Sequence, residues 1–535
     1  MISGLKIGNF KAFGPTQDIP LRPITLVFGP NSAGKSSIIQ SLLLARHIQD
    51  TEKVDAHQTT LGGAAVDLGC FARYVRNRQN ERETSIYFSI ECSAISTKLS
   101  WLDGFETLTI AYKIGKLGYG TTEQERAQIA VTSVSIFLDS HEIHRLKRGE
   151  NGLFRTEKAP VSDIPVEFTI KGLRLNCLNP LPKQAFFTTD DLPPEQQTPG
   201  DEPLQFFAEL VKLRTDENDE SDWPGYAEAM QRYAERGSYD EPTESHFKKA
   251  TSLVPRYNME LLIEVANQAL DEGLANVLYL GPLRWIPPRH LLETDEFDAS
   301  WRAGGGDAWQ RLRREPELLE RVNHFLRASL RTRYRLECQH FTRVRSAASP
   351  AGHSPSEPLS AHLAEDPPPE AKRGVPGADE TITILSIVEA DTGLSVSHRD
   401  VGTGVSQLLP VLVNAAGSKG QLIMIEQPEL HLHPALQAEL GDVFIESALG
   451  ENKNTFLIET HSEHLILRLL RRIRETAENA LPEGVTPIRP EDVSVLYVEP
   501  GKDGSKVLHL PVNAEGDFDK PWPDGFFSER AKELF

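Results

Sequence analysis

The sequence predicts an α/β fold whose central parallel sheet is assembled from both ends of the chain. Three segments carry this prediction, because each is a short apolar run followed by a helical pattern: residues 24–28, 421–426 and 455–459. Apolar runs that alternate with helical patterns are typical of buried parallel strands. The first run lies near the amino end and the other two lie near the carboxyl end. We therefore expect the residues between them to leave this sheet and return to it.

The remaining elements follow from hydrophobic spacing taken in chain order. Alternating apolar and polar residues after position 80 predict a β-rich segment, and apolar residues at helical spacing predict helices further on. The predicted strands are 2–8, 84–90, 107–114, 129–138, 166–175, 277–280, 381–389, 394–398 and 493–498. The predicted helices are 35–48, within 201–275, near 306–329, 406–416, 435–449 and 462–475.

Composition bounds the class of protein. The chain has 535 residues, of which 39% are hydrophobic and 25% charged, and its formal net charge is −20. The sequence shows neither a membrane-spanning apolar run nor a signal-peptide pattern. Its four scattered cysteines match neither a zinc site nor a disulfide framework, so we expect a cytoplasmic protein without a membrane partner. The negative charge opposes nonspecific DNA binding, although the basic clusters at 331–335 and 468–474 leave a local basic groove open.

The strand at 24–28 leads directly into a glycine-rich loop. Gly29 is followed by four residues and then by Gly34, Lys35 and Ser36 at the start of a helical pattern. Such a loop turns backbone N–H groups and a helix N-terminus toward phosphate oxygens, while its lysine reaches the β- and γ-phosphates and its hydroxyl holds Mg²⁺. We expect these residues to bind ATP or GTP with Mg²⁺: Gly29, Pro30, Asn31, Ser32, Ala33, Gly34, Lys35, Ser36 and Ser37.

The strand at 421–426 ends in a carboxylate, which is how a phosphate-loop protein supplies its second contact to Mg²⁺. The expected metal residues are therefore Ser36 and Glu426. A general base for hydrolysis is expected at the next position, which is Gln427 in this chain, and Glu429 follows. An amide orients water but accepts no proton at neutral pH. We expect slow hydrolysis or a long-lived ATP-bound state, with Glu426 or Glu429 as a substitute base.

Two further groups complete the predicted site. His461 follows the strand at 455–459 and is expected to contact the γ-phosphate or the attacking water. Gly404, Ser406 and Gln407 open the helix predicted over 406–416, and Ser406 is expected to cap its N-terminus. A helix N-terminus is an anion site. Because each subunit already has a phosphate loop, a second such site predicts a nucleotide held between two subunits, whereas the pattern alone also fits an ordinary helix cap.

His431 and His433 alternate directly after the acidic strand. Two histidines at this spacing are compatible with a metal pair. We interpret them as structural residues that shape the loop.

These four elements, in this order, resemble the ATP-binding-cassette ATPase superfamily. Residues 9–13 and 425–434 resemble the RecF/SMC-like and OLD-like branch, and residues 522–527 resemble the C-terminal extension of a bacterial group within it. The resemblance covers about 1–70, about 395–475 and the carboxyl end. It implies a P-loop ABC-type ATPase head assembled from N- and C-terminal segments, with a β-rich lobe and a helical insertion.

The resemblance also implies function. It implies a homodimer or a higher even oligomer with two ATP molecules at the interface, in which Ser406 acts in trans and Gln427 departs from the usual glutamate. ATPases of this kind resemble the sensor component of anti-phage defence systems, which controls a separate effector nuclease or toxin. Two alternatives stay open: a DNA-repair or recombination ATPase that clamps DNA, and an ATP-binding scaffold without turnover.

We expect four parts along the chain. They are an ATPase lobe with a β-rich segment at 1–175, a helical insertion at 176–395 with a mobile loop at 346–379, a second ATPase lobe at 396–485, and a C-terminal extension at 486–535. Glu499, Asp517 and Asp519 in the extension form a pattern similar to a TOPRIM nuclease. Too few residues follow for such a domain, so we expect any nuclease to be a separate partner.

Overall fold

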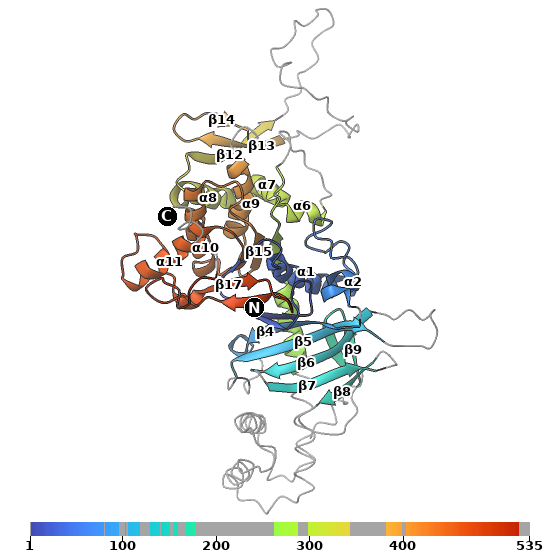
Figure 1. The fold of residues 1–535 in the computed structure, drawn as a ribbon. Coiled ribbons are helices and arrows are strands. Elements are labelled where there is room, and N and C mark those ends of the chain that lie inside the picture. Colours follow the sequence, from blue (N-terminus) through green and yellow to red (C-terminus); the bar gives the residue numbers. More distant parts are fainter. Residues whose placement is uncertain are drawn as a thin grey trace, which may run out of the picture.

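The computed structural model describes residues 2–79, 81–95, 102, 105–117, 129–139, 141–149, 153–158, 167–177, 262–286, 298–342, 381–397 and 403–523. Figure 1 shows a central sheet region with helices α8, α9, α10 and α11 on one side and a broad second sheet, β4 to β9, on the other. The α/β prediction with a β-rich lobe is confirmed. No helix within the described part of the chain is long and apolar enough to cross a membrane.

The central sheet has six strands, and its order explains how the two ends of the chain meet. The order is β11 (Val277–Leu280), β15 (Leu422–Glu426), β16 (Thr455–Glu459), β3 (Ile24–Phe28), β17 (Val493–Glu499) and β18 (Lys506–His509). The first five strands run parallel, and β18 is antiparallel to β17. The amino-terminal strand β3 therefore lies between two strands from the carboxyl end, as predicted.

Alternation along these strands builds a core on each face of the sheet. Val27 and Leu457 belong to the core that includes α1 (Lys35–Thr51) and the second sheet. Leu26 and Ile458 belong to the core on the opposite face. That core includes α9 (Thr403–Gly417), α10 (Pro434–Leu449) and α11 (Glu463–Ala477). The parallel part of the central sheet is thus buried on both faces, which matches its predominantly apolar strands.

The β-rich lobe is a nine-stranded antiparallel sheet in the order β10-β9-β8-β7-β6-β5-β4-β1-β2. Its strands are β1 (Ile2–Gly8), β2 (Gln17–Pro20), β4 (Thr84–Glu91), β5 (Thr107–Lys116), β6 (Ile129–Leu138), β7 (His141–Arg148), β8 (Phe154–Lys158), β9 (Glu167–Lys171) and β10 (Arg174–Cys177). The single strand predicted over 166–175 is wrong: it is two strands, because Gly172 turns the chain with a φ of +62°.

The middle of the chain adds helices and a small sheet. Residues 262–275 are helical, and α6 (Ala299–Ala303), α7 (Gly306–Arg314) and α8 (Pro316–His324) follow, the last continuing into a π-helical turn, Phe325–Ser329. The small sheet has the order β12 (Tyr334–Thr342), β13 (Thr381–Glu389) and β14 (Ser395–Val396). The helical prediction over 201–261 and the loop predicted at 346–379 lie outside the described residues.

Short elements complete the fold: α2 (Phe71–Tyr74) and the 3-10 turns Arg76–Arg78, Cys92–Ala94 and Pro490–Asp492. The predicted C-terminal extension contributes β17 and β18 to the central sheet. Trp522 then packs edge-on against Phe28 and Phe518, with ring centroids 5.3 and 5.0 Å away. Strand β17 and Trp522 therefore both contact β3.

Candidate functional site

The phosphate loop between β3 and α1 has the strained backbone that its glycines allow. Gly29 and Gly34 have φ values of +142° and +109°. A Cβ on Gly29 would lie 2.4 Å from the carbonyl oxygen of Val498, so only glycine fits there. The Lys35 ammonium donates to the carbonyl oxygens of Gly29 and Pro30 at 3.0 and 3.1 Å. Burial lowers the pKa of Lys35, while the charge of Glu459 opposes this shift.

Two carboxylates meet the loop, because parallel strands β15 and β16 end at the same edge of the sheet. Glu426 and Glu459 are register partners at the ends of these strands. The Ser36 hydroxyl donates to Oε2 of Glu459 at 2.7 Å, and the Lys35 ammonium lies 3.9 Å from Oε1. The Ser36 hydroxyl thus bonds Glu459, which the sequence analysis did not single out, and it also opposes the rise that burial causes in the pKa of Glu426, the other expected metal residue.

Electrostatics at this edge favours a bound cation. Burial, followed by the negative charge of Glu459, raises the pKa of Glu426 to about 7, and the Ser36 hydroxyl opposes the shift. Burial also raises the pKa of Glu459. A hydroxyl beside two buried carboxylates is a set of oxygen ligands of the kind that Mg²⁺ prefers. The residues present thus fit the expected metal ion.

A tyrosine from the neighbouring strand orients the first carboxylate. The Tyr279 hydroxyl, on β11, donates to Oε1 of Glu426 at 2.8 Å. Tyr279 is 9% exposed. The apolar strand at 277–280 is visible in the sequence, but its place beside β15 is not. The strand was therefore predicted, whereas the contact of Tyr279 with Glu426 was not.

The loop after β15 holds the predicted hydrolytic residues in a network. Gln427 has a φ of +47°, and its N–H donates to the carbonyl oxygen of Glu459 at 2.7 Å. Glu429 accepts hydrogen bonds from the Thr460 hydroxyl at 2.8 Å and from the His461 N–H at 2.7 Å. Burial raises the pKa of Glu429, and these bonds oppose the shift. The network joins the loop after β15 to the loop after β16.

The charge of Lys35 in the phosphate loop acts on the pKa of His461. Burial lowers its pKa, and the positive charge of Lys35 lowers it further. A neutral imidazole at this position donates or accepts a hydrogen bond without adding charge. This state suits the predicted contact with a phosphate oxygen or with water.

The helix α9 begins earlier than predicted. It starts at Thr403, so Ser406 lies in its first turn and the prediction that Ser406 caps the helix is wrong. The side chain of Ser406 is fully buried. A Cβ on Gly404 would lie 2.7 Å from the carbonyl oxygen of His431, so this turn packs tightly on the loop after β15.

Gln407 is held by the turn after β11. Its side-chain oxygen accepts from the Arg284 N–H at 3.3 Å, and its side-chain nitrogen donates to the Arg284 carbonyl oxygen at 2.8 Å. The Arg284 guanidinium in turn donates to the carbonyl oxygens of Glu426 and Gln427. Arg284 is a second residue of β11 and its turn that sequence reasoning missed.

His433 has a structural role, in line with its interpretation. Its Nδ1 accepts a hydrogen bond from the Ala435 N–H at 3.3 Å, which caps the N-terminus of α10. His431 has a φ of +66°. Both residues shape the loop between β15 and α10.

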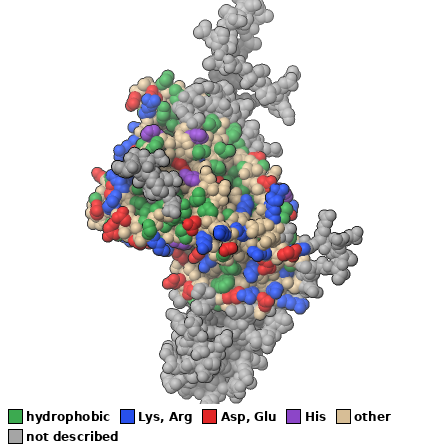
Figure 2. Space-filling view, viewed as in Figure 1, with side chains coloured by type: hydrophobic (Ala, Val, Ile, Leu, Met, Phe, Trp, Pro, Cys, Tyr) green, Lys and Arg blue, Asp and Glu red, His purple; other side chains and the backbone are tan. Residues whose placement is uncertain are grey.

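The basic cluster on α11 is partly neutralised within the chain, by two carboxylates. Arg468 and Arg472 form ion pairs with Asp442, at 2.6 and 2.8 Å. Arg471 and Arg472 form ion pairs with Glu475, at 2.6 and 2.7 Å. Figure 2 shows Lys and Arg side chains interspersed with Asp and Glu over the described part of the visible face. These pairs leave α11 with less charge for a phosphate backbone than its sequence indicates.

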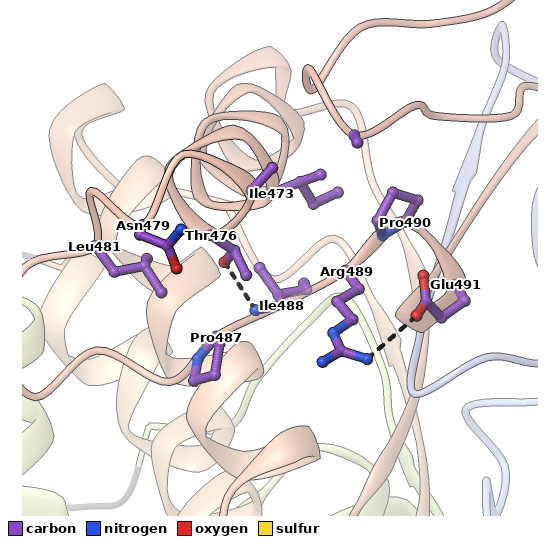
Figure 3. A pocket seen from close by; sticks show the side chains of 11 residues that line it. Ile473, Thr476, Asn479, Leu481, Pro487, Ile488, Arg489, Pro490 and Glu491 are labelled. Atoms are coloured by element: carbon purple, nitrogen blue, oxygen red, sulfur yellow. Dashed lines mark hydrogen bonds and ion pairs between the residues drawn. The ribbon is translucent and has the colours of Figure 1, made fainter.

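A cavity of about 630 Å³ lies away from the predicted site, where α11 ends. Apolar side chains such as Ile473 and Ile488 line it, and Thr476 accepts a hydrogen bond from the Ile488 N–H (Figure 3). Arg489 and Glu491 form an ion pair, 3.8 Å apart, at its edge (Figure 3). None of the predicted site residues lines this cavity. The assignment of the candidate site therefore depends on the residues that meet at the phosphate loop, and not on this cavity.

Three protein families match segments of the chain. An AAA domain matches residues 4–131, and an AAA ATPase domain matches residues 363–466. A family described as a protein of unknown function, DUF3696, matches residues 488–535. No curated protein matches the chain. The two AAA matches contain the phosphate loop and the strand that ends in Glu426, so the chain carries ATPase domain segments that bind ATP.

Solved structures of SMC head domains also align with the chain. The Smc head domain of Pyrococcus furiosus, with an extended coiled coil and bound to the C-terminal domain of ScpA, has a TM-score of 0.36 at 10% identity and covers 100% of this chain and 98% of that one. The SmcHead bound to the C-winged helix domain of ScpA has a TM-score of 0.39 at 10% identity, and the alignment covers 95% of this chain and 98% of that one. The SMC head domain of Thermotoga maritima has a TM-score of 0.34 at 9% identity, and the alignment covers 96% of this chain and 99% of that one. We rest the fold on the strand order and the ATPase assignment on the family matches.

Proposed function

We propose that this chain is a dimeric switch ATPase of the RecF/SMC/OLD-like class, which binds ATP with Mg²⁺ and hydrolyses it slowly. The observation that carries the proposal is the meeting of the phosphate loop with the ends of β15 and β16. There the Ser36 hydroxyl lies against Glu459, and Glu426 is register partner to Glu459. The residue after Glu426 is Gln427, which accepts no proton at neutral pH.

Each residue has a role in this proposal. The phosphate-loop N–H groups and Lys35 bind the phosphates, and the Lys35 ammonium exchanges the loop carbonyls for phosphate oxygens. Ser36 and Glu426 would hold Mg²⁺, with Glu459 beside them, and the metal supplies charge neutralisation of the phosphate oxygens. Gln427 orients water. Glu429 is kept in place by the bonds from the loop after β16.

Steady-state ATPase measurements test slow turnover. We expect low turnover in the wild type, at least tenfold faster turnover in Gln427→Glu because a general base contributes about 10²-fold or more, and loss of turnover in Glu426→Ala. Gln339→Glu adds the same charge at an exposed position of β12 and serves as the matched control. Turnover above about 10 s⁻¹ in the wild type, which is the median turnover of enzymes, contradicts the slow switch. ATP binding with no ADP release at all favours the scaffold alternative.

The dimer is the second part of the proposal. Support comes from the sequence pattern: the phosphate loop of a subunit binds one nucleotide, and the second anion site expected at the start of α9 needs a nucleotide from elsewhere. Sedimentation velocity should show a dimer with ATP and Mg²⁺ and a monomer with ADP. Lys35→Ala, which weakens phosphate binding, should stay monomeric in both. A wild-type sedimentation coefficient that is the same with ATP and ADP contradicts the ATP-dependent dimer.

We further propose a cytoplasmic role as the sensor or scaffold of an anti-phage defence system with a separate effector nuclease or toxin. Its support is the resemblance at 425–434 and 522–527. Phage should form fewer plaques on cells that express the chain with its native gene neighbours than on cells that express the Lys35→Ala variant. Equal plaque counts contradict this role. The DNA-clamp alternative has weaker support, because Asp442 and Glu475 pair with the arginines of α11.

A further inference from the structure

Arg284 lies in the turn after β11 and touches neither the phosphate loop nor a predicted catalytic side chain through the bonds described above. Its side chain is only 5% exposed. Burial lowers its pKa to about 10. One guanidinium nitrogen, Nη2, donates to the carbonyl oxygens of Glu426 at 2.9 Å and Gln427 at 3.1 Å. Nε and Nη1 of the same guanidinium are buried without a hydrogen-bond partner among the described residues. The two bonds of Nη2 are therefore the contacts through which this buried charge acts on its neighbours.

The two bonds hold a strained segment of backbone. Gln427 has a φ of +47°, which is uncommon for a residue with a side chain. Pro428 follows, and the residue before a proline normally adopts an extended backbone. The peptide is held from both sides, because the Gln427 N–H donates to the Glu459 carbonyl oxygen at 2.7 Å while its own carbonyl accepts from Arg284. Strain of this kind persists only where its surroundings impose it.

The main chain of Arg284 is attached to a different element. Both polar atoms of the Gln407 side chain pair with it, one with its N–H and the other with its carbonyl oxygen. Gln407 lies in the first turns of α9. The charge of Arg284 also opposes the rise that burial causes in the pKa of Glu429. Arg284 thus connects the start of α9 to the backbone of Gln427, and its charge also acts on the Glu429 carboxylate.

We propose that Arg284 is a positioning residue that couples the start of α9 to the orientation of Gln427. A displacement of α9 moves the Arg284 main chain through Gln407, and the guanidinium passes the displacement to the carbonyls of Glu426 and Gln427. The coupling rests on the proposed function in one respect, since α9 is the element expected to meet the nucleotide of a second subunit. Under this coupling, the strained peptide after Glu426 changes its orientation when α9 moves.

Hydrogen–deuterium exchange of the full chain, with and without ATP and Mg²⁺, tests the coupling without requiring turnover. In Arg284→Met we expect exchange in 427–433 to be about tenfold faster than in the wild type, because the backbone at Glu426 and Gln427, where this segment begins, loses both contacts with Arg284. ATP should protect 403–409 and 427–433 together in the wild type and only 403–409 in the variant. The Kd for ATP should change by less than about threefold, because the phosphate loop keeps its contacts. Where the wild type turns over, kcat should fall about tenfold at a similar KM.

Arg311→Met is the matched control. Arg311 donates to the Gly417 carbonyl oxygen at the other end of α9, at 2.9 Å, and pairs with Glu315. It should leave exchange in 427–433 and ATPase activity unchanged. If Arg284→Met does not fold, Gln407→Met breaks the connection from the side of α9 and should likewise abolish the ATP-dependent protection of 427–433. Unchanged exchange in 427–433, or joint protection of both segments in the variant, overturns the coupling. A wild type without turnover contradicts the slow ATPase and leaves the exchange result to decide the coupling.

Discussion

At the residue scale, the Glu426 carboxylate illustrates how neighbours prepare a group for a metal ion. Burial and the charge of Glu459 make the ionised form costly, while the Tyr279 hydroxyl stabilises it. A bound cation favours the ionised form as well. Tyr279 and Mg²⁺ therefore act in the same direction on one carboxylate. The residue that donates to Glu426 should set how much Mg²⁺ the site needs.

Tyr279→Phe removes this donor without removing the ring. A hydrogen bond to a charged group contributes about 1.5–3 kcal/mol, so the Mg²⁺ concentration for half-maximal ATP binding should rise about tenfold at pH 7.5. Titration of a fluorescent ATP analogue against Mg²⁺ measures it. Tyr112→Phe is the control, because its hydroxyl donates to the Leu173 carbonyl oxygen at 2.7 Å within the β-rich lobe. An unchanged Mg²⁺ requirement in Tyr279→Phe contradicts the role.

At the element scale, the turn between β17 and β18 supports the phosphate loop. The Ser505 hydroxyl donates to the Ala33 carbonyl oxygen at 2.5 Å, and its N–H donates to the Ala12 carbonyl oxygen at 2.9 Å. The Arg76 guanidinium donates to the same Ala12 oxygen at 2.6 Å and to the Lys502 carbonyl oxygen at 3.4 Å. A segment from the carboxyl end thus fixes two turns from the amino end.

Ser505→Ala should therefore weaken ATP binding more than it weakens folding. Loss of one buried hydrogen bond, about 1 kcal/mol, predicts a Kd for ATP about fivefold higher with kcat nearly unchanged. Equilibrium binding and steady-state rates separate the two quantities. Ser447→Ala removes a comparable buried bond, to the Ala415 carbonyl oxygen at 2.7 Å, and should leave the Kd unchanged. A lower kcat at the wild-type Kd would refute this role of the turn.

At the scale of the whole molecule, the β-rich lobe and the central sheet share one core through α1. The lobe contains a buried titratable group, His144 on β7, which is 5% exposed. Burial lowers its pKa to about 4 from an ordinary value of 6.5. The unfolded chain therefore binds a proton between these two pH values that the folded chain does not bind. The free energy of unfolding is fully present above pH 6.5 and falls as the pH decreases toward 4.

His144→Phe should remove part of this acid sensitivity. A shift of this size corresponds to about 3 kcal/mol between pH 7 and pH 4, and the variant should lose that much less stability over the range. Urea unfolding at several pH values measures the difference. Leu146→Ala, at a buried position of the same strand that does not titrate, should lower stability but keep the wild-type pH dependence. Parallel pH profiles for His144→Phe and the wild type would exclude His144 as a source.

The sequence by itself determined the parts of the site whose geometry is local. The phosphate loop from Gly29 to Ser37 and the strand that ends in Glu426 were predictable because their chemistry depends on residues adjacent in the chain. The β-rich segment was also predictable from alternation, although Gly172 divides its last predicted strand. The prediction of a sheet built from both chain ends followed from where its apolar runs occur.

Only the tertiary structure decided which residues share the site with that loop. Glu459, Tyr279 and Arg284 reach it because β16 and β11 lie beside β15, and nothing in their own segments specifies this order. The start of α9 was misjudged at Ser406: the helix begins at Thr403, and its Gly404 packs on the loop after β15, a contact that the local sequence does not specify. Local spacing determines a local backbone, whereas contacts between distant strands depend on how the apolar faces of the whole chain are buried together.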